Sequence, residues 1–163
     1  MPDRRYPKDL PLEVRGYVAG IIDGEGTISI NRASFPRQPQ LSVRYTAILS
    51  VGNTDYKVME LLISLFGGNV VTRPPTEKHK RFYVWQARGP HARAILEEHI
   101  GPYLLLKRAQ SDLLIEFVRD FRSFKGGPRT RRISPEELAR REAIWRAIKA
   151  LNRPGPARAY ADG

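Results

Sequence analysis

The chain has 163 residues, of which 41% are hydrophobic and 28% charged, the composition of a globular protein with room for one domain. Its 28 Lys and Arg against 17 Asp and Glu give a net charge of +11, so a polyanion is the expected partner and nucleic acid the leading candidate. The absence of cysteine excludes disulfides and thiolate zinc sites, and no apolar run approaches the roughly 20 residues that span a membrane.

The first residues lack the apolar stretch of a secretory signal, so we expect a cytoplasmic protein without a membrane partner. The prevalence of arginine, the 13 prolines and the missing cysteine favour a thermophilic prokaryote as the source.

The first predicted element is a helix from Leu10 to Asp23, with Pro11 near its start and Gly24 and Gly26 as terminators. One face of this helix carries small or short side chains, which would let a second helix approach closely: Gly16, Ala19, Gly20 and Asp23. Such a stripe more often packs within its own chain. Here the chain has no second copy of the motif, so we expect the face to form a dimer interface.

Two acids, Asp23 and Glu25, stand at the carboxyl end of the predicted helix. The helix dipole disfavours negative charge there by about 0.3–1 kcal/mol each. A divalent cation would reverse that preference, because Mg²⁺ and Ca²⁺ bind carboxylate and carbonyl oxygens. The sequence therefore predicts a cation site at this helix end.

Strands and helices alternate along the rest of the chain. Period-two alternation predicts strands, and apolar residues at helical spacing predict helices. The predicted strands are Thr27–Ala33, Leu41–Val51, Asn69–Arg73 and Arg81–Ala87, and the predicted helices are Asp55–Phe66, His91–His99, Leu104–Phe121 and Ser134–Leu151. We expect an α+β fold in the order αββαββα with additional C-terminal helices. One domain would cover residues 6–152, and residues 153–163 would form a disordered tail.

The four strands predict an antiparallel sheet with one polar face. Such a face is a credible surface for reading duplex DNA, since a β-ribbon fits the major groove.

Several motifs resemble one known family. The stretch Leu10–Gly26, LPLEVRGYVAGIIDGEG, is similar to the signature of the LAGLIDADG homing endonucleases. The stretch Pro102–Arg108, PYLLLKR, and the helix that starts at Ser134 also resemble members with a single motif. The resemblance covers nearly the whole chain and implies the homing-endonuclease fold with a four-stranded DNA-binding sheet.

The resemblance also implies a homodimer whose two signature helices pack together and bring one acid per chain to a shared site. Glu25 matches the family's catalytic, metal-binding acid, with the Gly24 carbonyl as a neighbouring ligand, although the family more commonly has Asp at this position. Lys107 matches a lysine that stabilises charge in the transition state. Asn53 and Lys57 match a polar residue that orients water and a basic residue in the next helix. The implied cofactor is Mg²⁺, for which Mn²⁺ would substitute, whereas Ca²⁺ would bind without supporting cleavage.

Alternative roles remain open for two of these residues. Asn53 is equally suited to cap the next helix. Lys107 could be a solvated lysine at the start of a helix.

Candidate DNA contacts lie on the predicted strands and in basic loops. They are Ser29, Asn31, Arg32, Arg37, Gln40, Arg44, Thr46, Arg73, Lys78, Lys80, Arg81 and Tyr83, joined by the basic loop 125–132. Strand residues would read bases, whereas Arg37, Lys78, Lys80 and the basic loop would contact phosphates.

Taken together, these features predict an intron-encoded, site-specific endonuclease that hydrolyses both strands of a long pseudo-palindromic DNA site. The alternatives are an RNA maturase of the same fold, whose partner would be the host intron RNA, and a non-catalytic DNA-binding protein. A basic structural protein without a specific site is a further alternative, and the acids at the helix end argue against it.

Overall fold

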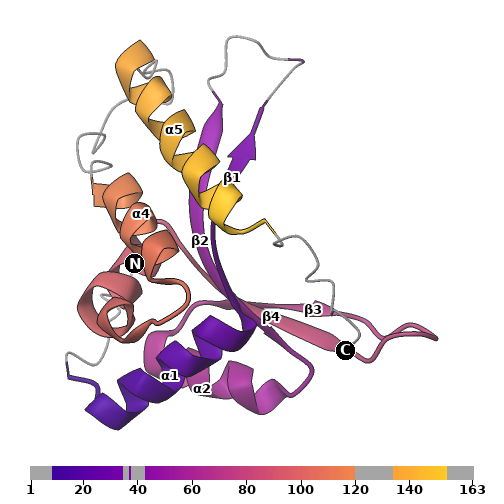
Figure 1. Ribbon diagram of the computed structural model, residues 1–163. Helices are drawn as coiled ribbons and strands as arrows, with labels where there is room; N and C mark the ends of the chain where they lie inside the picture. The colour runs from indigo at the N-terminus through magenta and orange to yellow at the C-terminus, as the bar shows by residue number, and fades with distance from the viewer. Residues whose placement is uncertain (1–8, 35–36, 38–42, 120–133, 154–163) are drawn as a thin grey trace, which may run out of the picture.

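A computed structural model describes residues 9–34, 37, 43–119 and 134–153. The described chain forms α1 (Leu12–Glu25), β1 (Gly26–Ala33), β2 (Arg44–Asn53), α2 (Tyr56–Phe66), β3 (Asn69–Arg73), β4 (Phe82–Arg88), α3 (Pro90–Ile95), the π-helical turn η1 (Leu96–Ile100), the 3₁₀ turn η2 (Gly101–Tyr103), α4 (Arg108–Arg119) and α5 (Pro135–Leu151) (Figure 1). The order αββαββα with additional C-terminal helices is thus confirmed. In the described part, no helix is both long and apolar enough to cross a membrane.

The four strands form one antiparallel sheet in the order β1-β2-β4-β3. Val51 lies opposite both Gly26 on β1 and Trp85 on β4, and Trp85 lies opposite Val70 on β3. This row crosses the sheet at the point where α1 passes into β1. Beyond it the β1–β2 hairpin and the β3–β4 hairpin extend in different directions (Figure 1).

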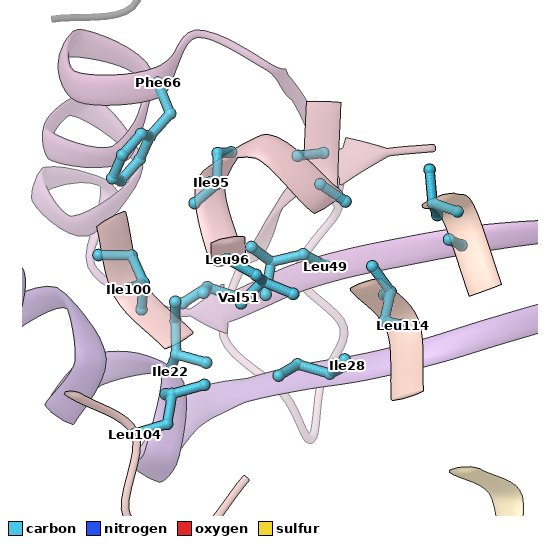
Figure 2. Packing of buried hydrophobic residues seen from close by; sticks show 14 of the residues in the cluster. Ile22, Ile28, Leu49, Val51, Phe66, Ile95, Leu96, Ile100, Leu104 and Leu114 are labelled. Carbon is cyan, nitrogen blue, oxygen red and sulfur yellow. The ribbon is translucent and has the colours of Figure 1, made fainter. Parts of the chain in front are cut away.

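The two faces of the sheet differ sharply. Ile28, Leu49, Val51 and Trp85 are fully buried and point toward the helices, as period-two alternation requires. Their neighbours along the strands are half-buried or exposed. Figure 2 shows side chains from β1 and β2 meeting those of α1, α2, α4 and η1, with Leu104 next to Ile22. We call the opposite side, which holds the half-buried and exposed residues, the open face.

Two helix boundaries differ from the sequence-based expectation. The predicted helix from Leu104 is wrong at its start, because α4 begins only at Arg108. The three residues before it, 105–107, are held by contacts to α1, described below. The predicted helix His91–His99 starts earlier, at Pro90, and its last part winds as a π-helical turn.

The C-terminal helix α5 closes the free edge of β1. Its start matches the expectation, since the Ser134 hydroxyl accepts a hydrogen bond from the Glu137 N–H at 3.2 Å. At its other end, the Asn152 side-chain amide donates to the carbonyl of Ile28 at 2.8 Å. This bond satisfies an edge carbonyl of β1 and ties α5 to the sheet.

Candidate active site and nucleic-acid interface

Two helix ends cap each other at the carboxyl terminus of α1. The Asp23 carboxylate accepts the backbone N–H groups of Leu105, Leu106 and Lys107 at 2.7, 3.1 and 3.0 Å. In return, Lys107 Nζ donates to the carbonyls of Ile22 and Asp23 at 2.8 and 2.6 Å. A carboxylate thus lies at the amino end of α4 and an ammonium at the carboxyl end of α1, where the respective helix dipoles favour each charge.

This reciprocal arrangement changes the reading of the two acids. Asp23 needs no metal, because three N–H groups stabilise its charge, so the expectation of a cation is wrong for this residue. Lys107 supplies the positive charge at the helix end instead. Partial burial lowers the pKa of Lys107, and the charges of Asp23 and Glu25 partly oppose that shift. Lys107 is therefore no solvated surface lysine.

Glu25 is the second acid at the carboxyl end of α1. It is the last residue of α1 and is exposed, and its charge acts on Lys107. The carbonyl of Gly24 follows the two that Lys107 occupies. Within the described residues, no group of three His, Asp or Glu side chains could hold a metal ion. One carboxylate and one carbonyl have the oxygen chemistry that Mg²⁺ prefers, so further oxygens from outside the chain, such as phosphates, would have to complete the site.

The predicted residues Asn53 and Lys57 lie at the turn between β2 and α2. Asn53 Oδ1 accepts the backbone N–H of Asp55 at 2.8 Å, and Asp55 caps α2 by accepting the N–H of Lys57 at 3.0 Å. The helix cap is therefore Asp55, and Asn53 shapes the turn before it. The Lys57 side chain is exposed. Asn53 lies two residues beyond Val51, so the end of β2 lies beside the end of α1.

One face of α1 is exposed and nearly bare. Gly16, Gly20 and Gly24 follow one another at a spacing of four, and a Cβ atom built on any of them meets nothing within 4 Å. Ala19, which we expected on the same face, is only 1% exposed and belongs to the core, so that assignment is wrong. Asp23 is likewise taken up by its contacts to residues 105–107.

No contact within the described chain requires these glycines. Each one weakens a helix by about 0.5–1 kcal/mol relative to alanine. Large apolar side chains are exposed at both ends of the same helix: Leu12 and Tyr17 near its start, and Leu105, which is 84% exposed, and Leu106 beside its end. An apolar surface with glycine along its middle suits the close approach of another helix.

The open face of the sheet carries most of the predicted base contacts. Ser29, Asn31, Arg44 and Thr46 lie on it, because they alternate with buried residues along their strands. Arg73 lies on it as well, because it is paired with Phe82, which alternates with the buried Trp85. Gln86 and Arg88 lie on the same face and were not predicted, because the prediction assumed the opposite parity for β4. The signal was present: Trp85 is a core residue by size, so its neighbours at alternate positions must point the other way.

Three of the predicted strand contacts, Arg32, Arg81 and Tyr83, do not lie on the open face. Tyr83 lies on the side of Trp85 and packs edge-to-face on Tyr56 of α2, with ring centroids 4.9 Å apart. The Nε of Arg32 donates to Glu142 of α5 at 3.1 Å and to the Tyr45 hydroxyl at 3.3 Å. The expected position on the open face is therefore wrong for both Tyr83 and Arg32, because each side chain joins the sheet to a helix.

Arg32, Tyr45 and Glu142 form a hydrogen-bonded cluster between the sheet and α5. Glu142 also accepts a short hydrogen bond from the Tyr45 hydroxyl, and burial together with this carboxylate raises the pKa of Tyr45. The Arg32 guanidinium also lies over the ring of Trp145, 5.4 Å from its centroid.

The predicted loop contacts are exposed where the structure describes them. Arg37, Lys78 and Lys80 are all exposed, and so is Arg81, which was predicted as a strand contact. Arg81 precedes β4, and strand alternation places it on the side of Tyr83. Gln40, the basic loop 125–132 and the predicted tail lie outside the described residues.

Comparison with known proteins gives a likeness in structure alone. No protein-family model matches the chain, and no curated protein matches it. The homing endonuclease I-CvuI, solved with its target in the presence of calcium, is 21% identical with a TM-score of 0.67 over 88% of this chain and 84% of that chain. The archaeal intron-encoded homing endonuclease I-Vdi141I, solved with DNA, is 17% identical with a TM-score of 0.68 over 87% of this chain and 86% of that chain.

A third neighbour has a longer chain. The LAGLIDADG homing endonuclease I-GzeII, solved with a DNA target, is 19% identical with a TM-score of 0.60 over 83% of this chain but only 43% of its own. These likenesses show that the chain has the homing-endonuclease fold, as its sequence motifs indicate.

Proposed function

We propose that the chain is a site-specific endonuclease that binds double-stranded DNA as a homodimer and hydrolyses both strands in a reaction that depends on Mg²⁺. This proposal rests on the difference between the two acids at the end of α1. The Asp23 carboxylate accepts hydrogen bonds from the backbone N–H groups of residues 105–107, whereas Glu25 remains exposed beside the ammonium of Lys107. A free carboxylate next to a cation, on a strongly basic protein, suits metal-assisted hydrolysis of a phosphodiester.

The exposed glycine face of α1 supports a homodimer. A second copy packed on Gly16, Gly20 and Gly24 would bring two copies of Glu25 close together, one for each DNA strand. In the neighbour I-GzeII, the matched region makes up 43% of the chain, which leaves space for a second region of the same size. A second copy of this chain would take that place.

Glu25 and the Gly24 carbonyl would hold the metal ion, with phosphate oxygens of the DNA completing the coordination. Bound Mg²⁺ would supply Lewis-acid stabilisation of the phosphate charge and lower the pKa of a bound water. We propose that Mn²⁺ can replace it and that Ca²⁺ binds without supporting cleavage. Lys107 adds positive charge beside the scissile phosphate, and partial burial makes that charge more effective than it would be in water.

The open face supports the DNA-binding part of the proposal. Arginine, serine, asparagine and glutamine side chains there offer donors and acceptors for base edges in the major groove. Exposed basic residues in the described loops, Arg37, Lys78 and Lys80, would contact phosphates and set the salt dependence of binding. A maturase or a non-catalytic DNA-binding protein would use the same face but would not need an exposed Glu25.

The test is cleavage of a plasmid library with a randomised insert, with and without Mg²⁺, followed by sequencing of the ends. The proposal predicts discrete ends that require Mg²⁺ and a recovered site with two-fold symmetry. Tight retention of DNA or structured RNA without any cleavage would refute the nuclease and favour a binding protein or a maturase.

A further inference from the structure

An apolar patch interrupts the polar open face of the sheet. Val71 of β3 lies opposite Val84 of β4, which in turn lies opposite Gly52 of β2. Residues opposite each other in an antiparallel pair point to the same side. Phe82 lies on the same side and covers Gly52, where a Cβ atom would be 2.5 Å from the ring. We call Val71, Phe82 and Val84 the apolar patch.

The patch is open to solvent. Val71 is 44% exposed, and Phe82 and Val84 are only half-buried. Single exposed apolar residues are common on proteins, but three adjacent ones on a sheet face indicate a contact surface.

The surroundings of the patch identify the kind of partner. Asn69 and Gln86 face each other on one side of it, and Arg73 lies opposite Phe82 on the other. Hydrogen-bonding groups and an arginine around an apolar centre suit the major groove, where the edge of an A·T pair presents donors and acceptors together with the C5-methyl group of thymine. The net charge of +11 favours DNA over an apolar protein surface.

We propose that the apolar patch reads the methyl groups of thymines, so that the site bound by this protein carries thymine in each half-site at the positions facing Val71 and Val84. This inference rests on the proposed DNA-binding function. Ser, Asn, Arg and Gln side chains on the open face would read hydrogen-bonding groups, and the patch would add a contact that no polar side chain replaces.

The experiment replaces thymine with deoxyuridine, which removes the methyl group and keeps the base pairing. Binding is measured in Ca²⁺, at fixed salt, with a DNA site selected from a randomised library by repeated rounds of binding, so that the site is obtained whether or not the protein cuts. We expect the affinity of the unaltered protein to fall about fourfold for each contacted methyl, since burial of one CH₂ group is worth about 0.8 kcal/mol. In the Val71→Ser, Val84→Ser double variant, which removes the methyl groups of both side chains, deoxyuridine at the positions facing them should cost nothing further.

The matched control is Thr72→Ser, which removes a methyl group from the opposite side of the same strand and should keep the full response to deoxyuridine. Unchanged affinity of the unaltered protein for the deoxyuridine site would overturn the proposal, as would a double variant that remains equally sensitive. Because the readout is binding, a protein that binds this DNA without cutting it would refute the nuclease yet leave the patch testable, and a site without thymine would refute the patch alone.

Discussion

Replacing Asp23 with alanine tests the reciprocal capping of α1 and α4. The change removes the acceptor for three backbone N–H groups, at 2.7, 3.1 and 3.0 Å, and removes the negative charge from the amino end of α4. Loss of a helix cap costs about 0.5–2 kcal/mol, and a hydrogen bond to a charged group is worth about 1.5–3 kcal/mol. Leu105 and Leu106 are exposed, so water can replace part of what is lost.

Removal of the charge also brings a small gain. At the carboxyl end of α1 a carboxylate is unfavourable by about 0.3–1 kcal/mol. Setting about 1.5–3 kcal/mol for the lost hydrogen bonds to the carboxylate against this gain of about 0.3–1 kcal/mol leaves a net loss of about 0.5–2.7 kcal/mol, which for a chain of this size lowers the melting temperature by about 1–11 °C. The stability of Asp23→Asn should lie between that of the unaltered protein and that of Asp23→Ala, because the amide keeps one oxygen acceptor but loses the charge.

The assay is thermal unfolding followed by circular dichroism, at one protein concentration because a dimer's stability depends on it. The control is Glu25→Ala, which removes an equal charge two residues further along the chain. It should leave the melting temperature unchanged or raise it slightly. Equal destabilisation by the two variants would refute the capping role of Asp23.

Three further predictions follow from the same structure. Lys107→Met should slow cleavage with DNA affinity nearly intact and should lower stability, since two carbonyls of α1 lose their donor; an unchanged cleavage rate would remove Lys107 from the site. Gly20→Leu should abolish dimer formation in analytical ultracentrifugation while the monomer keeps its fold, whereas Glu60→Leu on the exposed side of α2 should leave assembly intact. Hydrogen bonds from Arg140 and Arg141 lower the pKa of Glu137 in the folded protein below its ordinary 4.5. As pH falls below 4.5, the unfolded chain therefore takes up the Glu137 proton before the folded chain does, and the stability that Glu137 contributes is progressively lost. Glu137→Gln should flatten this part of the acid unfolding profile.

The helices and strands were predicted well because their signals depend only on neighbouring residues in the sequence. Alternation on the strands, glycine after the helices and the Ser134 cap each depend on neighbours within a few residues. The parity of β4 was predictable too, since Trp85 alone marks the core side. An error there misplaced Tyr83 and hid Gln86 and Arg88.

The missed parts of the site depend on contacts between distant segments. The sequence favours a helix from Leu104, but Asp23, more than 80 residues earlier, binds the N–H groups of residues 105–107 and holds them outside it. The same contact explains why an acid is tolerated at the end of α1 without a cation. Arg32 was misassigned for a similar reason, because its partner Glu142 lies on α5.

The most direct test of the central claim compares Glu25→Gln with the unaltered protein on the recovered DNA site, with binding and cleavage measured on the same samples in Mg²⁺. Glu13→Gln, which changes an exposed acid at the other end of α1, is the control and should bind and cut normally. The account predicts that Glu25→Gln binds the site within about threefold of the unaltered protein and does not cut it. Normal cleavage by Glu25→Gln, or loss of binding together with cleavage, would contradict the role given to Glu25.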